Sequence, residues 1–116
     1  MSEIKRIDPG ARICGAVVHG DTVYVAGTVA KDPSVGAKGQ TEQILARIDE
    51  LLGKAGSSKS KILSCTVWVA DMRHYDDMNA AWDAWLDKAN PPARATVETH
   101  LANPKYLVEI AAVAAR

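Results

Sequence analysis

The alternation of strand-like and helix-like segments limits the possible folds of this chain more than any other feature of its sequence. Residues 41–55 and residues 75–86 carry apolar side chains at helical spacing. The six strand-like segments are residues 3–7, 15–19, 22–27, 62–70, 94–100 and 105–115. Each helix joins two strands as a crossover, which favours a mixed or partly parallel sheet with both helices on one face. We therefore predict an α+β domain with a mixed six-stranded sheet.

Glycine and proline mark the ends of several predicted elements. Gly20 and Asp21 predict a hairpin turn between the second and third strands. Gly56 predicts the end of the first helix. Residues 90–92, Asn-Pro-Pro, predict the end of the second helix, because proline cannot continue a helix. Residues 31–39 hold one proline and two glycines and predict a loop.

A sheet with both helices on one side needs another cover for its second face. In the strand pattern of residues 62–70, Thr66 and Trp68 point toward this second face, and the last strand is rich in alanine. A partly apolar open face is typical of an oligomer interface. The 14 basic and 14 acidic residues leave no net charge, which also favours self-association.

Length and composition exclude several classes of protein. The 116 residues allow a single domain, residues 1–116, with one core. The charge balance argues against nucleic-acid binding, which is associated with a basic excess. Residues 1–10 lack the apolar segment of a secretion signal, and no apolar run reaches the ~20 residues of a membrane span. We expect a soluble, cytoplasmic protein without a membrane or nucleic-acid partner.

The cysteines and histidines do not have the spacing of a metal site. Cys14 and Cys65 are too few and too far apart for a zinc site or a disulfide framework, and we expect two reduced, buried thiols. His19, His74 and His100 do not lie on one element. We therefore expect no metal.

Arg94 is the first candidate for chemistry. It follows the rigid pair Pro91–Pro92 at the start of a predicted strand, where it shares a face with Thr96 and Glu98. One interpretation is a surface arginine paired with Glu98. The other is a planar guanidinium that binds a substrate carboxylate through two parallel hydrogen bonds.

Glu109 is the second candidate, because it interrupts an apolar strand. Leu107, Ala111 and Val113 lie on the same face of that strand. A charge in such a setting costs several kcal/mol unless a partner stabilises it. One interpretation is a carboxylate at a sheet edge or paired with an arginine across an interface. The other is a carboxylate that positions or activates a water molecule.

Two blocks of the sequence together form a specific combination. The first is Pro92-Ala93-Arg94, and the second is residues 108–114, Val-Glu-Ile-Ala-Ala-Val-Ala. With these blocks the chain resembles the reactive intermediate deaminase family (RidA, also called the YjgF family), and the resemblance covers nearly the whole chain. Residues 78–85 and 103–106 are similar to the smaller YoaB-like branch of that family.

The resemblance implies a chorismate-mutase-like, YjgF-type fold and a homotrimer with three clefts between neighbouring subunits. It also implies an enzyme that hydrolyses C=N bonds, converting reactive 2-imino or enamine acids to 2-keto acids and ammonia without a cofactor. By resemblance, Arg94 binds the substrate carboxylate and Glu109 holds the attacking water, assisted by backbone groups near Thr96.

Three departures from the family pattern concern the predicted pocket. Ile13 takes the place of a tyrosine, Ala26 takes the place of a serine, and the loop that starts at Asn90 is shorter. We place Ile13, Ala26 and Asn90 with Arg94 and Thr96 among the substrate-binding residues, in a pocket that is less polar than the family pattern. An alternative stays open: a trimeric module that binds small carboxylates such as keto acids without turnover.

Overall fold

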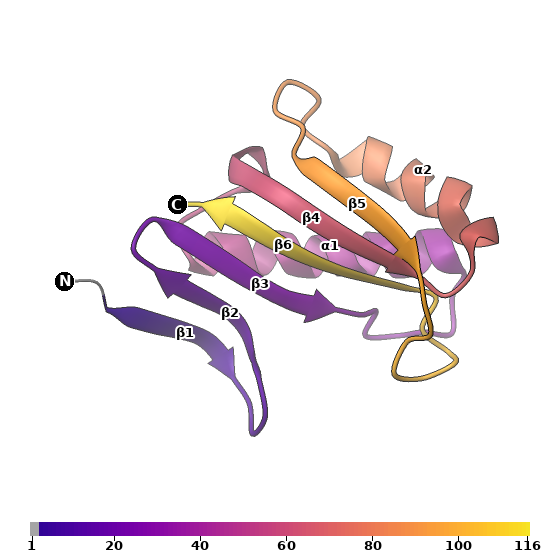
Figure 1. Cartoon of the computed structure of the whole chain (residues 1–116), viewed down its shortest axis with the longest axis horizontal. Helices are drawn as coiled ribbons and strands as arrows, with labels where there is room; N and C mark the ends of the chain where they lie inside the picture. Colours follow the sequence, from indigo (N-terminus) through magenta and orange to yellow (C-terminus); the bar gives the residue numbers. More distant parts are fainter. Residues whose placement is uncertain (1–2) are drawn as a thin grey trace.

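The computed structural model describes residues 3–116, which form six strands and two α-helices (Figure 1). The strands are β1 (Ile4–Pro9), β2 (Cys14–His19), β3 (Thr22–Thr28), β4 (Ile62–Val69), β5 (Ala93–Glu98) and β6 (Val108–Ala115). The helices are α1 (Ala37–Lys54) and α2 (Tyr75–Trp85), and short 3-10 turns at Lys59–Lys61 and Met72–His74 precede β4 and α2. This order of elements confirms the predicted α+β class.

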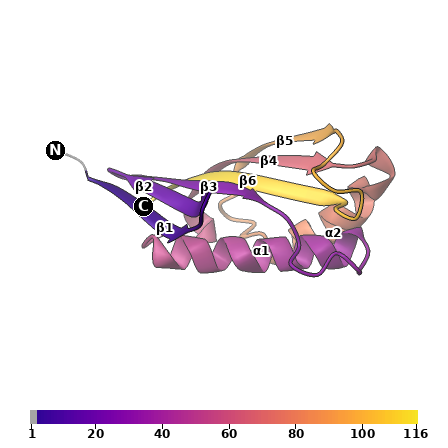
Figure 2. The same ribbon diagram turned by 90° about the horizontal axis from the view of Figure 1, so that it is seen from below.

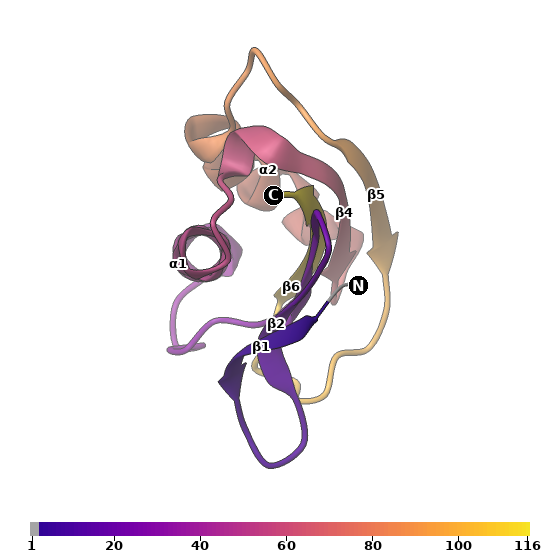
Figure 3. The same ribbon diagram turned by 90° about the vertical axis from the view of Figure 1, so that its left-hand side faces the viewer.

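The strands form one mixed sheet in the order β1-β2-β3-β6-β4-β5. β4 and β5 are parallel and are connected through α2, whereas the other neighbouring pairs are antiparallel. Both helices lie on one side of the sheet, as predicted (Figure 2 and Figure 3). The connection from β3 through α1 to β4 passes over β6, which fills the space between these two strands. Neither helix within residues 3–116 combines the length and the apolar character of a membrane span.

A row of register partners crosses the sheet on the side that the helices cover. It runs through Ile7, Ala16, Val25, Ala112, Cys65 and Arg94. The five members of the row on β1, β2, β3, β6 and β4 are at most 5% exposed and belong to the core. The row places Arg94 at its end, on the edge strand β5.

The two cysteines differ in their surroundings. Cys65 is buried, as predicted, and burial raises the pKa of its thiol to about 11, so the thiol stays protonated at neutral pH. Cys14 is only half-buried, contrary to the prediction. It begins β2 opposite Pro9, the last residue of β1, and therefore lies at the margin of the sheet.

The structure corrects several predicted boundaries. α1 begins at Ala37, inside the predicted loop, and β6 begins at Val108 rather than at residue 105. β1 continues to Pro9, and β5 ends at Glu98 rather than at residue 100. The side chain of Gln40 contacts the segments that precede both α1 and β6.

Gln40 is fully buried and connects two segments that are distant in the sequence. Its Nε2 lies within hydrogen-bond distance of the carbonyls of Pro33 (3.1 Å), Val35 (3.1 Å) and Lys105 (3.0 Å), which share its two N–H donors, and its Oε1 accepts from the N–H of Leu107 (2.9 Å). The amide thus satisfies backbone groups that would otherwise be paired within a longer strand or with water. It ties the loop before α1 to the turn before β6.

We expect Gln40→Leu to lower the free energy of unfolding by about 2–3 kcal/mol, because buried backbone groups lose their partner. Chemical denaturation at fixed protein concentration measures the change. Gln43→Leu is the matched control, because Gln43 also bonds the loop, at Asp32, but in an exposed position. Equal losses in the two variants would contradict the role of Gln40.

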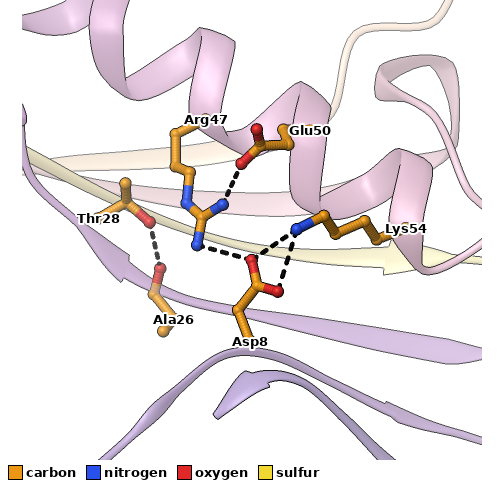
Figure 4. A network of polar contacts seen from close by, with 6 residues as sticks. All are labelled: Asp8, Ala26, Thr28, Arg47, Glu50 and Lys54. Carbon is orange, nitrogen blue, oxygen red and sulfur yellow. Dashed lines mark hydrogen bonds and ion pairs between the residues drawn. The ribbon is translucent and has the colours of Figure 1, made fainter. Parts of the chain in front are cut away.

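A network of charged side chains connects β1 to α1 (Figure 4). The carboxylate of Asp8 accepts from Lys54 Nζ at 3.0 and 2.9 Å and lies 3.1 Å from Arg47 Nη2. Arg47 also pairs with Glu50 on its own helix. The hydrogen bond from Lys54, assisted by Arg47, lowers the pKa of Asp8 against the opposing effect of desolvation.

This lowered pKa predicts a pH-dependent difference in stability between the wild type and Asp8→Asn. The unfolded chain binds the proton more readily, so the carboxylate stabilises the fold above the ordinary pKa of aspartate. The contribution is lost as the pH falls through the lower pKa of the folded state. Thermal melting at low salt should show the melting temperatures of the wild type and Asp8→Asn converging as the pH falls through the acidic range. Asp83→Asn, at an exposed position of α2, is the matched control for the removal of one carboxylate.

Candidate functional site

Arg94 lies at the start of β5, and its side chain turns toward α2. Its Nη1 donates to Oδ1 of Asn79 at 2.8 Å. Its Cζ lies 5.0 Å from the centre of the Trp82 ring and 5.9 Å from that of the Tyr75 ring. The guanidinium is half-buried between two aromatic faces, which stabilise a cation through their π electrons.

One edge of the Arg94 guanidinium has unused donors. Nη1 makes a second, weak contact with Met78 Sδ at 3.9 Å, and Nη2 lies 3.4 Å from the Tyr75 hydroxyl. The hydrogen bonds found within residues 3–116 give no acceptor to Nε–H. The pairing with Glu98 considered from the sequence is not observed, because that carboxylate accepts from the N–H of Met72 at 2.7 Å. The Nε and Nη2 edge can therefore bind both oxygens of a carboxylate.

Thr96 supplies a second unused polar group on the same face of β5. Its Oγ1 is buried and has no hydrogen-bond partner in the part of the chain that the structure describes. An unpaired buried hydroxyl costs about 1–3 kcal/mol. A polar ligand at this position would offset that cost. Arg94, Thr96, Tyr75, Asn79 and Trp82 are called the Arg94 group below.

Glu109 lies on β6, on the face of the sheet that the helices leave open. Its register partner on β4 is Trp68, which in turn pairs with Val97 of β5. The carboxylate lies against Gly27, where a Cβ atom would overlap its Oε2. Glycine at position 27 thus makes room for the carboxylate. With Trp68 and His100, Glu109 also borders a cavity of about 200 Å³.

Ile13 and Ala26 border another cavity, of about 250 Å³, which also contacts Gly27. Ile13 is 70% exposed, and the carbonyl of Ala26 accepts from the Thr28 hydroxyl at 2.9 Å (Figure 4). Gly27 is therefore common to this cavity and to the carboxylate of Glu109. Ile13, Ala26, Gly27 and Glu109 are called the Gly27 group.

The two groups do not meet within one protomer. β4 separates β6 from β5, and β6 and β4 together separate β3 from β5, so two or three strand spacings, or about 10–14 Å, lie between their backbones. Arg94 faces the helices, whereas Glu109 faces the opposite side of the sheet. A small ligand cannot contact both side chains of one copy.

Asn90 belongs to neither group. Its Nδ2 and its backbone N–H both donate to Asp87, each at 3.0 Å, in the loop between α2 and β5. A further cavity of about 620 Å³ between β3 and α1 holds none of the predicted residues. Arg47 borders that cavity, but its charge is already balanced by Asp8 and Glu50.

Sequence reasoning missed Asn79 and Gly27 as site residues. An apolar stripe at helical spacing usually indicates core packing, and Trp82 does belong to the core. Asn79 lies four residues after Tyr75 and three before Trp82, on the same side of the helix. The sequence signal for Asn79 is a polar residue between aromatic residues on one side of the predicted helix.

Comparisons with known proteins agree with this fold and with the sequence blocks. The family model described as endoribonuclease L-PSP matches residues 3–116. A RutC family protein named YoaB, from Escherichia coli (strain K12), is 46% identical over 112 residues, which are 97% of this chain and 97% of that protein.

Two solved structures show the same architecture. A member of the YjgF protein family from Neisseria meningitidis has a TM-score of 0.95 and 35% identity, covering 98% of this chain and 95% of that one. A putative translation initiation inhibitor from Salmonella typhimurium has a TM-score of 0.90 and 42% identity, covering 97% of each chain. The protein therefore belongs to the endoribonuclease L-PSP family, the YjgF/RidA family that its arginine and glutamate blocks resemble, and it is similar to the YoaB-like branch.

Proposed function

We propose that this protein is an imine deaminase, which hydrolyses reactive 2-imino or enamine acids to 2-keto acids and ammonia. The observation that carries the proposal is the guanidinium of Arg94, on the strand face that it shares with Thr96, whose buried hydroxyl is unpaired in the described residues. Its Nε–H has no acceptor within the described residues, and Nη2, which makes one long contact of 3.4 Å with the Tyr75 hydroxyl, keeps a second N–H. This pair of groups suits a small carboxylate. We further propose that the protein acts in the cytoplasm, where its two free cysteines would remain reduced.

The first step is the binding of the substrate carboxylate to Arg94. Two charge-assisted hydrogen bonds fix the plane of the carboxylate and thereby the position of the adjacent C=N carbon. The rings of Tyr75 and Trp82 exclude water from one side of the guanidinium, which strengthens its attraction for an anion.

The second step is the attack of water on the C=N carbon. The carboxylate of Glu109 accepts a proton from the water as the C–O bond forms, and the nitrogen is protonated to give a carbinolamine. Collapse of this intermediate breaks the C–N bond and releases ammonia, leaving the 2-keto acid. The reaction consumes one water molecule and no oxidant or reductant.

The geometry of one protomer supports the participation of a second copy in this reaction. Because the Arg94 group and the Gly27 group lie apart, we propose that a cleft joins the Arg94 group of one copy to the Gly27 group of another. The open face offers a surface for the contact, since Tyr24, Leu63 and Val97 are exposed there by 49%, 55% and 42%. A closed arrangement of three copies, a homotrimer, would form three equivalent clefts.

A second candidate function is the binding of small carboxylates without turnover. The exposed, apolar Ile13 favours it, because this residue brings no hydrogen-bonding group to the cavity beside Gly27. Keto-acid binding in the absence of ammonia release would support this alternative over the enzyme.

We expect Arg94→Ala to lower kcat/KM for ammonia release by about 100-fold, because two charge-assisted hydrogen bonds are together worth ~3 kcal/mol. The assay couples the protein to a pyridoxal-phosphate-dependent dehydratase that produces the imine. Arg73→Ala is the matched control, since Arg73 is exposed and pairs with Asp71 at 3.6 Å. Sedimentation should show the same oligomer for all three proteins. Undiminished acceleration by Arg94→Ala would refute the proposal.

We expect Glu109→Gln to reduce kcat by about 10²–10⁴-fold, because the amide cannot accept the proton from water. The dissociation constant for a keto acid should change little. Gly27→Ala should also slow turnover, since its Cβ displaces the carboxylate. Glu42→Gln, at an exposed position of α1, serves as the control. An unaltered rate in Glu109→Gln would exclude the proposed role of this carboxylate.

A further inference from the structure

The orientation of Arg94 is determined by α2. An arginine on an edge strand has many rotamers, and fixing them costs ~2 kcal/mol of conformational entropy. Tyr75, Asn79 and Trp82 contact the guanidinium from one side of α2, at successive turns of the helix. The helix is itself anchored, because Met78 and Trp82 are buried in the core.

The groups that hold Arg94 are uncharged. The hydrogen bond of 2.8 Å goes to a side-chain amide, and the two rings contribute their π faces and, at 3.4 Å, the neutral hydroxyl of Tyr75. Within the described residues Arg94 forms no ion pair. A carboxylate at position 79 would make the same contact, but it would neutralise the guanidinium and compete with an anionic ligand. The Asn79 amide fixes the side chain of Arg94 and leaves the positive charge of Arg94 available to a ligand.

We propose that Asn79 is a positioning residue for substrate binding, which fixes Nη1 of Arg94 so that the Nε and Nη2 edge faces the substrate carboxylate. The ring of Trp82 forms the platform on which the guanidinium lies. This proposal rests on the proposed function, because it assigns to Arg94 a carboxylate ligand. Asn79 does not itself touch the reacting atoms.

Two substitutions separate the geometric contribution of Asn79 from its neutrality. Asn79→Ala removes the acceptor, and we expect it to weaken pyruvate binding about tenfold and to raise KM more than it lowers kcat. Asn79→Asp keeps an acceptor but adds a charge, and we expect a larger loss, which added salt reduces. Calorimetric titration with pyruvate measures binding in both variants, and the coupled dehydratase assay measures KM and kcat. Asn103→Ala, which removes an asparagine that caps an exposed turn at Lys105, is the matched control.

A spectroscopic readout tests the position of Arg94 without a substrate. In the wild type, the ¹⁵N-labelled side chain should give a sharp Nε–H resonance with slow rotation of the guanidinium. In Asn79→Ala this resonance should broaden or exchange with solvent at least tenfold faster, whereas the control Asn103→Ala should resemble the wild type. Thermal melting shows whether each variant is folded.

Three results would overturn the proposal. The first is an unchanged Arg94 resonance in a folded Asn79→Ala protein. The second is unchanged pyruvate binding in that variant, and the third is equal or tighter binding in Asn79→Asp. If the wild type neither binds pyruvate nor releases ammonia, the proposed function fails, whereas the resonance experiment still shows whether Asn79 positions Arg94.

Discussion

The hydrogen-bonded register of β6 between β3 and β4 fixes the place of every candidate residue. Val108 and Ile110 are fully buried on the helix-covered side, and Glu109, between them, faces the open side. A shift of one residue would bury the Glu109 carboxylate and expose Ile110, at a cost of several kcal/mol. The same alternation separates Glu109 from Arg94. The proposal of a second protomer in the site rests on this alternation of side chains along β6.

α2 serves the core and the Arg94 group with the same side chains. Met78 and Trp82 are buried in the main hydrophobic cluster, and both contact the guanidinium of Arg94. The arginine therefore lies partly against side chains that are packed in the core, which reduces the entropy lost when a ligand binds. Stability and binding are coupled here. A substitution at Trp82 would change both the stability and the binding of a ligand. Asn79 lies at the margin of the core, so it can be altered without disturbing the core itself.

The sequence predicted the helices, the mixed sheet and the family because these depend on local pattern. Apolar spacing predicted α1 and α2, and the two sequence blocks predicted the YjgF/RidA family. The predictions were wrong where distant contacts decide the outcome. Gln40 joins the segments that precede α1 and β6, and its bond to Leu107 spans 67 positions. Local pattern cannot show a side chain that is shared by two loops so far apart.

The amino-acid sequence by itself determined which charged residues interrupt the strands, and so it identified Arg94 and Glu109 as candidates. Only the tertiary structure decided which neighbours they have. Asn79 holds Arg94 because α2 packs beside β5, and Gly27 accommodates Glu109 because β3 pairs with β6. Strand periodicity is a property of consecutive residues and can be read along the chain. A hydrogen bond or a steric fit between two elements depends on how the sheet and helices pack, which no local pattern contains.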